Sequence, residues 1–301
     1  MKPAALFLLN PDMMELIYDE SARARIEQEF AMVASAHTAD TYRELGPQLQ
    51  EVEAIISGWS MPEMTPEFLE IFPKLKVLFY GAGSVRGIAT KASWKRGVRV
   101  VSAGSVNAIP TSEFAFANII LCLKQVWVQA YQITRRAQYE RSIQHVTGAY
   151  NSTVGLLGLG QIGKLVARRL ATLDVKVIAT DPMISAPEAE ALGVKLASLD
   201  EVFAQSDVVS CHIPWLPTTE RILTGAHFRS MKPNASFINS ARGAVVAENE
   251  MIEVLTARPD LFALLDVTYP EPPAEGSPLY TLPNVVLTPH IAGSAGGECH
   301  R

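Results

Sequence analysis

The amino-acid sequence predicts an α/β protein with two doubly wound parallel sheets in series. Short apolar runs of strand length alternate along the whole chain with segments whose apolar residues recur at helical spacing. The apolar runs are continuous in Val, Ile and Leu, which is typical of parallel strands covered on both faces. At 301 residues, the chain is long for one hydrophobic core and sufficient for two.

The apolar runs predict the positions of the strands. In the first half of the chain they are residues 5–10, 30–35, 53–58, 75–81 and 98–104. In the second half they are residues 152–158, 175–181, 207–213, 235–241, 262–267 and 285–290. The helical segments between these runs supply the crossover connections that parallel strands require.

An apolar segment between the two halves predicts a long helix that joins the domains. Pro110 suits the first helical position, and a Thr-Ser-Glu start signal follows it. Apolar residues then recur at helical spacing as far as Ile133, a length of about 35–40 Å at 1.5 Å per residue. We therefore expect one domain over residues 1–109, which residues 292–301 can rejoin, and a second domain over residues 110–291.

The segment TVGLLGLGQIG, from Thr153 to Gly163, has the form of a strand, a glycine-rich turn and the start of a helix. Gly158, Gly160 and Gly163 follow the G-x-G-x-x-G spacing, in which a helix N-terminus and its turn receive a pyrophosphate. The next predicted strand ends at Asp181, 18 residues after Gly163, where a carboxylate meets ribose hydroxyls. A carboxylate there repels a 2′-phosphate, so the pattern favours NAD over NADP. By themselves, the glycines also fit an ordinary turn, and Asp181 also fits a helix cap.

Three later predicted strands are each followed by an unusual polar side chain. Arg242 follows the first, Asp266 and Glu271 follow the second, and His290 follows the third. These groups should meet at the carboxyl edge of one sheet, although each alone also fits a structural role. Together they match hydride transfer to a 2-oxo acid. That reaction needs a bidentate cation for the carboxylate and a proton donor that titrates near neutrality. When the donor is a histidine, the reaction also needs a neighbouring acid that favours the protonated imidazolium form of the ring.

These blocks, in this order, resemble the D-isomer-specific 2-hydroxyacid dehydrogenase family, which includes D-lactate, glyoxylate/hydroxypyruvate and phosphoglycerate dehydrogenases. The resemblance covers nearly the whole chain and rests on TVGLLGLGQIG with Asp181, DVVSCHIPWLPTTERIL, MKPNASFINSARGAVV, LDVTYPEPP and LPNVVLTPHIAGS. It implies a flavodoxin-like substrate domain that precedes a Rossmann NAD-binding domain. It also implies an NAD-dependent oxidoreductase that interconverts a small 2-oxo acid and its D-2-hydroxy acid.

The resemblance also implies roles for individual residues. Arg242 would bind and polarise the substrate, His290 would be the general acid/base, and Glu271 would be the partner of His290. The residues implied in cofactor binding are Gly158, Gly160, Gln161, Ile162, Gly163, Asp181, Ile213, Pro214, Thr219, Ser240, Ala241 and Asp266. The loop GAGS matches the substrate loop of the family, so the backbone of Ala82, Gly83 and Ser84 would bind the substrate carboxylate, although a plain turn has the same sequence form.

Composition argues against several other classes of protein. The net charge of −5 and the lack of any Lys/Arg run give no reason to expect nucleic acid or an anionic membrane as a partner. No apolar run approaches the roughly 20 residues of a membrane span, and the N-terminal segment fits a first strand better than a signal peptide. The cysteines Cys122, Cys211 and Cys299 are scattered and lack zinc-site spacing, so we expect no metal, no disulfide and a cytoplasmic location.

The resemblance leaves some questions of assembly and activity open. A homodimer is expected by analogy with the family. Family members usually continue beyond HIAGSAGGECHR for another helix that returns to the substrate domain, and two alternatives stay open here: a truncated chain, or a different arrangement of the hinge. Two other functions stay open: an NAD(H)-binding interaction protein of the corepressor type, and an enzyme for another small anion such as formate or phosphite.

Overall fold

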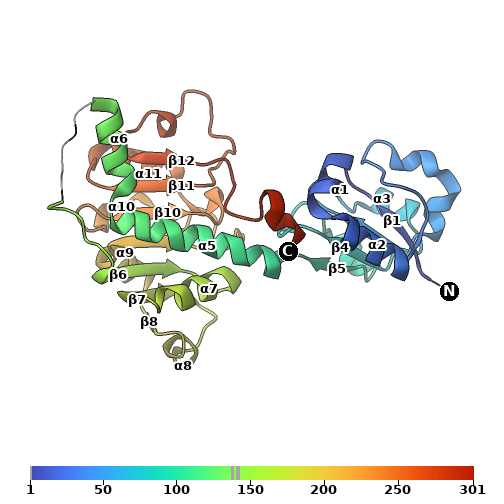
Figure 1. Cartoon of the computed structure of the whole chain (residues 1–301), viewed down its shortest axis with the longest axis horizontal. Coiled ribbons are helices and arrows are strands. Elements are labelled where there is room, and N and C mark those ends of the chain that lie inside the picture. Colours follow the sequence, from blue (N-terminus) through green and yellow to red (C-terminus); the bar gives the residue numbers. More distant parts are fainter. Residues whose placement is uncertain (1, 137–138, 140–142) are drawn as a thin grey trace. The chain divides into compact units, whose positions relative to one another are not determined.

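The computed structural model describes residues 2–136, 139 and 143–301, and the chain divides into two compact units. The first unit comprises Met1–Asn107 and Ser294–Arg301, and the second comprises Ala108–Gly293. Within the described residues, the strands form a five-stranded sheet and a seven-stranded sheet, and neighbouring strands in both are parallel (Figure 1). The predicted fold class is confirmed.

The five-stranded sheet of the first unit has the strand order β2-β1-β3-β4-β5, which is the flavodoxin-like order. Its strands are β1 (Ala4–Phe7), β2 (Ala31–Met32), β3 (Ala54–Ser57), β4 (Val77–Tyr80) and β5 (Arg99–Ser102). Its helices are α1 (Pro11–Ile17), α2 (Glu20–Glu29), α3 (Pro66–Ile71) and α4 (Lys91–Lys95), with the 3-10 segments η1 (Tyr42–Glu51) and η4 (Gly296–His300). Apolar side chains on both faces of the sheet are buried in two separate clusters, as parallel strands require.

The seven-stranded sheet of the second unit has the order β12-β11-β10-β9-β6-β7-β8. Its strands are β6 (Tyr150–Leu157), β7 (Asp174–Thr180), β8 (Val194–Leu196), β9 (Val208–Cys211), β10 (Ser236–Asn239), β11 (Phe262–Leu265) and β12 (Val285–Leu287). Its helices are α6 (Val126–Arg136), α7 (Gln161–Leu170), α8 (Ala186–Glu190), α9 (Leu199–Gln205), α10 (Gly225–Ser230) and α11 (Glu248–Ala257), with η2 (Gly243–Val245) and η3 (Pro278–Tyr280). The strand order reverses at β6, so a ligand crevice is expected beyond the carboxyl ends of β6 and β9.

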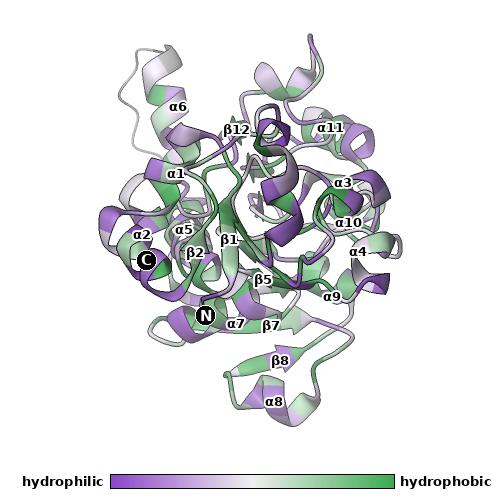
Figure 2. Ribbon diagram, turned by 90° about the vertical axis from the view of Figure 1, so that its right-hand side faces the viewer, coloured by the Kyte–Doolittle hydropathy of each residue, from purple (hydrophilic) through white to green (hydrophobic). Residues whose placement is uncertain are grey.

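Both faces of the seven-stranded sheet are buried. Leu156 and Val208 contribute to a cluster with α5 (Gly104–Leu123), α7 and α8, whereas their neighbours Leu157 and Val209 contribute to a cluster with α9, α10 and α11. In Figure 2 the strands are mainly green, and the helices around them mix green with purple. The central strands β9, β10 and β11 are buried at every position, so their continuous apolar runs reflect strands that have no solvent-facing side.

One strand of this sheet was missed by the sequence prediction. Strand β8 (Val194–Leu196) is three residues long and pairs with β7 at the edge of the sheet. Its central residue, Lys195, is exposed, so the segment offers no continuous apolar run. A short edge strand of this kind carries too little sequence signal to be recognised.

The predicted single helix from Pro110 to Ile133 is wrong in both its start and its continuity. Helix α5 begins at Gly104, and Pro110 lies inside it. The helix ends at Leu123, Gln125 takes a left-handed φ of 51°, and α6 begins at Val126. The break is stabilised because the N–H of Gly148 donates to the carbonyl of Leu123, a group that a continuous helix would have used itself.

Helix α5 also corrects the expectation that no segment is long and apolar enough to span a bilayer. Among the described residues, α5 has the length and composition of a membrane span, because Glu113 is its one charged residue. Half of that stretch is buried inside the structure, as in a core helix.

Candidate active site

The glycine motif forms the turn between β6 and α7, and its three glycines meet different constraints. Gly158 has a φ of 93°, and a Cβ on Gly163 would lie 2.1 Å from the carbonyl oxygen of Gly158. These two positions therefore accept only glycine without a shift of the backbone. A Cβ on Gly160 would have no described atom within 4 Å, so this glycine faces open space. A space of this kind allows a phosphate to lie directly against the backbone.

Helix α7 begins at this turn, so the positive end of the helix dipole lies there. Gly160 is the N-cap residue, and among the described residues no side chain caps the helix. The N–H groups of the first turn, which include those of Gln161, Ile162 and Gly163, lack helical acceptors and are oriented for an anion. Gln161 and Ile162 thus lie in the first turn of α7, directly after the glycine turn.

The carboxylate of Asp181 is fixed at the end of β7. One oxygen accepts a hydrogen bond from the backbone of Leu159 at 2.6 Å, and the other accepts one from the backbone of Met183 at 2.8 Å. Each carboxylate oxygen can accept more than one hydrogen bond, so both keep capacity for ribose hydroxyls. The contact with Leu159 places Asp181 directly against the glycine turn.

A cavity of about 1150 Å³ lies beside this turn, slightly larger than the range of about 300–1,000 Å³ for small-molecule sites. Of the residues predicted to bind the cofactor, those that line it are Gly158, Gly160, Asp181, Ile213, Pro214 and Thr219. The hydroxyl of Thr219 donates to the carbonyl of Pro214 at 2.6 Å, which closes the loop after β9. The N–H groups at the helix start suit the phosphates of a dinucleotide, the carboxylate suits the ribose hydroxyls, and the apolar walls suit the rings.

Several residues of this cavity escaped the sequence prediction. They are Lys164, Glu188, Glu201 and His212, together with the apolar segment 196–199. His212 is buried, and burial lowers the pKa of its imidazole to about 4, so the ring is neutral at neutral pH. Its Nε2 lies 3.1 Å from the hydroxyl of Ser210, and its Nδ1 has no hydrogen-bond partner among the described residues. The only available signal was that His212 directly precedes the predicted Ile213.

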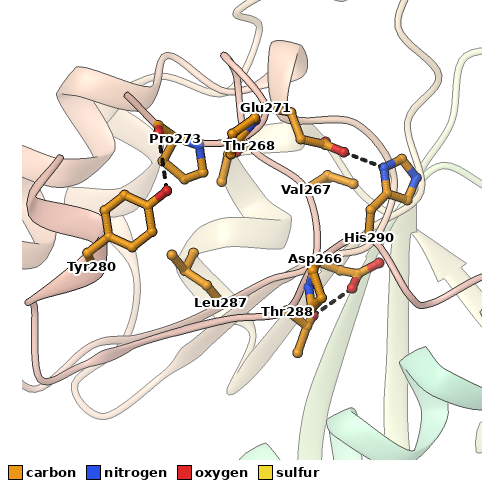
Figure 3. A pocket seen from close by; sticks show the side chains of 11 residues that line it. Asp266, Val267, Thr268, Glu271, Pro273, Tyr280, Leu287, Thr288 and His290 are labelled. Carbon is orange, nitrogen blue, oxygen red and sulfur yellow. Dashed lines mark hydrogen bonds and ion pairs between the residues drawn. The ribbon is translucent and has the colours of Figure 1, made fainter. Parts of the chain in front are cut away.

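His290 and Glu271 meet at the carboxyl edge of the same sheet. The Nδ1 atom of His290 lies 2.6 Å from Oε1 of Glu271, and Figure 3 shows the two side chains turned toward each other. Both side chains are a little under half exposed. The contact occupies Nδ1, which leaves Nε2 as the imidazole atom that can exchange a proton with a ligand. The pair borders a cavity of about 410 Å³, which Tyr280 and Leu287 also line.

Asp266 is buried and organises the loop that carries His290. Its carboxylate accepts hydrogen bonds from the hydroxyl of Thr288 at 2.6 Å and from the backbones of Ile291 and Ala292, each at 2.9 Å. The backbone N–H of His290 donates to the carbonyl of Asp266 at 3.0 Å. The segment 288–292 is therefore fixed by hydrogen bonds to both the carboxylate and the backbone carbonyl of Asp266.

Arg242 follows β10 in a loop that Asn239 organises. The side-chain amide of Asn239 accepts from the N–H of Ala241 and donates to the carbonyl of Arg242, both at 3.0 Å. A Cβ on Gly243 would lie 2.0 Å from the carbonyl carbon of Thr268, so this loop packs directly on the segment that carries Glu271. Neither of the two cavities has Arg242 among its described lining residues.

The remaining residues predicted to bind the cofactor, Ser240 and Ala241, are buried in the same loop. The hydroxyl of Ser240 has no hydrogen-bond partner among the described residues, so it keeps a donor for a ligand. Like Gln161, Ile162 and Gly163, these two residues do not appear among the described residues that line the large cavity. Asp266 lines the smaller cavity instead.

In the first unit, the predicted substrate loop follows β4. Ala82 is buried, and its carbonyl accepts a hydrogen bond from Ala103. Within the described part of the chain, the N–H groups of Ala82, Gly83 and Ser84 donate to no protein atom. Three successive free N–H groups form a suitable site for a carboxylate. Over the described residues, no group of His, Cys, Asp and Glu side chains is arranged to hold a metal ion, and the three cysteines are free thiols.

The chain is similar in sequence to known proteins over much of its length. The chain is 34% identical over 257 residues to D-3-phosphoglycerate dehydrogenase of Archaeoglobus fulgidus, an alignment that covers 85% of this chain and 48% of that protein. It is 35% identical over 228 residues to D-3-phosphoglycerate dehydrogenase of Mycobacterium tuberculosis, which covers 76% of this chain and 43% of that protein. The chain thus spans a little under half the length of these relatives.

A solved structure extends the similarity to the whole fold. The apo form of D-mandelate dehydrogenase from Rhodotorula graminis is 25% identical, with a TM-score of 0.80, over 99% of this chain and 90% of that chain. Residues 117–292 match the family described as D-isomer specific 2-hydroxyacid dehydrogenase, NAD binding domain. The matched residues contain the glycine turn, Asp181, Arg242 and the His290–Glu271 pair. The chain therefore belongs to the D-isomer-specific 2-hydroxyacid dehydrogenase family and contains its NAD-binding domain.

Proposed function

We propose that this protein is an NAD(H)-dependent oxidoreductase that interconverts a small 2-oxo acid and the corresponding D-2-hydroxy acid. The observation that carries the proposal is the 2.6 Å contact between Nδ1 of His290 and Glu271, in a chain that contains the NAD-binding domain of this family. An imidazole held by a carboxylate on one nitrogen and free on the other is suited to general acid/base catalysis.

In the proposed reaction, His290 handles the proton. The carboxylate of Glu271 holds the ring at Nδ1, and Nε2 of the protonated ring donates its proton to the carbonyl oxygen of the 2-oxo acid. In the oxidative direction, Nε2 accepts the hydroxyl proton of the D-2-hydroxy acid. The hydride that accompanies this proton is the chemistry supplied by bound NADH, or taken up by bound NAD. Asp266 acts through the loop 288–292, which it holds in place.

Arg242 and the loop Ala82–Ser84 would hold the substrate. A guanidinium binds a carboxylate through two parallel hydrogen bonds and polarises the neighbouring carbonyl group. The free N–H groups of Ala82, Gly83 and Ser84, in the first unit, are donors of the kind that a substrate carboxylate accepts. The cofactor itself would occupy the large cavity, with its pyrophosphate at the N-terminus of α7 and its ribose hydroxyls on Asp181.

A panel assay tests this proposal. The purified protein is mixed with NADH and with glyoxylate, pyruvate, hydroxypyruvate or bulkier 2-oxo acids, and the loss of NADH absorbance is followed. We expect turnover of at least one of these acids and a product of D configuration. NADH binding without turnover of any 2-oxo acid would contradict the proposal and favour a non-catalytic interaction protein. The homodimer implied by the family belongs to the same proposal and is tested by light scattering of the purified chain.

A further inference from the structure

A Ser-x-x-Glu motif occurs on each side of strand β8. Ser185 precedes α8 and Ser198 precedes α9, and each is followed three residues later by Glu188 or Glu201. The carboxylate of Glu188 accepts hydrogen bonds from the N–H and hydroxyl of Ser185 at 3.0 and 2.7 Å. The carboxylate of Glu201 accepts the corresponding bonds from Ser198 at 2.8 and 2.9 Å. Both glutamate side chains are therefore held in one position at the start of a short helix.

Both glutamates also line the large cavity, together with Asp181. The hydrogen bonds from the serine backbone and hydroxyl hold the pKa of Glu188 and of Glu201 below the ordinary value, so both are charged at neutral pH. Among the described residues that line this cavity, Lys164 is the one cationic side chain. Lys164 helps to lower the pKa of Glu188, and Lys195 helps to lower that of Glu201, so each glutamate has a cationic neighbour. Asp181, Glu188 and Glu201 bring three negative charges to the cavity lining against the one positive charge of Lys164, so the charge of the described lining is net negative.

This charge bears on which dinucleotide the cavity accepts. NADP differs from NAD by a 2′-phosphate on the adenosine ribose, and a nearby carboxylate disfavours that group. Like charges repel over several ångströms in the partly solvated mouth of a cavity, so carboxylates beyond the one on Asp181 add to the effect. We propose that Glu188 and Glu201 form, with Asp181, an anionic wall that rejects 2′-phosphorylated dinucleotides. Selection of NAD then does not depend on Asp181 alone.

The proposal differs from a purely structural role of the two Ser-x-x-Glu motifs. Gln can replace Glu in such a motif, because its side chain keeps a carbonyl oxygen that accepts the same hydrogen bonds. The double variant Glu188→Gln/Glu201→Gln therefore keeps the helix starts and loses both charges. Glu190→Gln, on the same helix α8 but outside the cavity, is the matched control for loss of a surface charge.

The measurement is the pair of dissociation constants for NADH and NADPH, obtained by fluorescence titration of the purified protein without substrate. We expect NADPH binding to tighten by about threefold to tenfold in the double variant, while NADH binding changes by less than about twofold. The midpoint of thermal unfolding should stay close to that of the wild type, and Glu190→Gln should leave both constants unchanged. Equal tightening for both dinucleotides, or no tightening for NADPH, would overturn the proposal.

Salt provides a second readout. Raising the ionic strength from about 0.01 M to about 1 M shortens the screening length from about 30 Å to about 3 Å. The ratio of the NADPH and NADH dissociation constants should fall with salt in the wild type and fall less in the double variant. Equal slopes would exclude an electrostatic role for the two glutamates. The inference rests on the proposed dinucleotide cavity, and a wild-type protein that fails to bind NADH would disprove that assignment instead.

Discussion

The carboxyl edges of the two sheets present different chemistry. At the edge of the seven-stranded sheet, the candidate groups are side chains: Arg242 after β10, Asp266 and Glu271 after β11, and His290 after β12. At the edge of the five-stranded sheet, the candidate groups are the backbone N–H groups of the loop after β4. Side chains can titrate and supply charge, whereas backbone groups can only donate from fixed positions. The edge of the seven-stranded sheet is thus suited to moving protons and supplying charge, whereas the loop after β4 is suited to binding an anion through its backbone.

This difference predicts where substitutions are damaging. The largest effect is expected for His290→Ala, because His290 is the residue proposed to exchange the proton through Nε2. Turnover of the best substrate should fall by at least about 100-fold, the usual scale for a positioned acid/base, while NADH still binds. Steady-state kinetics and an NADH titration of the same preparation measure both quantities. Turnover near the wild-type level would remove His290 from the mechanism.

A smaller but substantial loss is expected for Arg242→Lys. The variant keeps the positive charge, but a single ammonium cannot reproduce the paired hydrogen bonds of a guanidinium. We expect kcat/KM to fall by about tenfold or more, a loss of about 1.4 kcal/mol in transition-state stabilisation. Unchanged KM and kcat would show that Arg242 does not contact the substrate.

The neutral imidazole of His212 predicts a pH dependence of stability on the same edge. Its pKa is about 4 in the folded protein and about 6.5 in an unfolded chain, so between these values the unfolded state binds the extra proton. Its contribution to the free energy of unfolding should be full above about pH 6.5 and should fall by up to about 3 kcal/mol as the pH drops toward 4.

The test of this dependence is a series of thermal unfolding midpoints from neutral to acidic pH for the wild type and for His212→Asn. The substitution removes the titrating ring, so the midpoint of the variant should depend less on pH than that of the wild type. Parallel curves for the two proteins would show that His212 is not buried in its neutral form.

The smallest effect is expected on the other sheet, for Ser84→Ala. This substitution removes a hydroxyl but keeps the N–H group on which the proposed carboxylate site depends. Both kcat and KM should stay within about twofold of the wild type, because the hydrogen bond that the hydroxyl accepts from the N–H of Arg86 is long, at 3.4 Å, and exposed. A tenfold rise in KM would show that the first unit also contributes a side chain, and would weaken the contrast between the two edges.

Much of this architecture is predictable because buried parallel strands leave a strong sequence signal. The predicted apolar runs all contain strands, and the order of polar residues after them indicates which groups share an edge. The contact between His290 and Glu271 is different, because the 19 positions that separate them fix no distance. It depends on how Asp266 folds the loop between Thr288 and Ala292, which only the structure shows.

Features that depend on contacts between residues distant in sequence were not predictable. The break at Gln125 arises because Gly148, a residue distant in sequence, supplies the donor for the carbonyl of Leu123. The burial of His212 depends on packing against the glycine turn, which its sequence neighbours do not reveal. Glu188 and Glu201 look like ordinary residues at helix starts until the cavity brings them onto one wall.

The backbone of His290 constrains how this site can be engineered. Its φ of 55° lies in the left-handed region, and its N–H group is bound by the carbonyls of Asp266 and Thr288. Most side chains cost of order 1 kcal/mol in that conformation, whereas Asn and Gly tolerate it. A designer who wants an inactive but undistorted protein, for trapping a bound ligand, should therefore choose His290→Asn over His290→Ala. The loop itself restricts which residues can stand at this position, independently of the chemistry they perform.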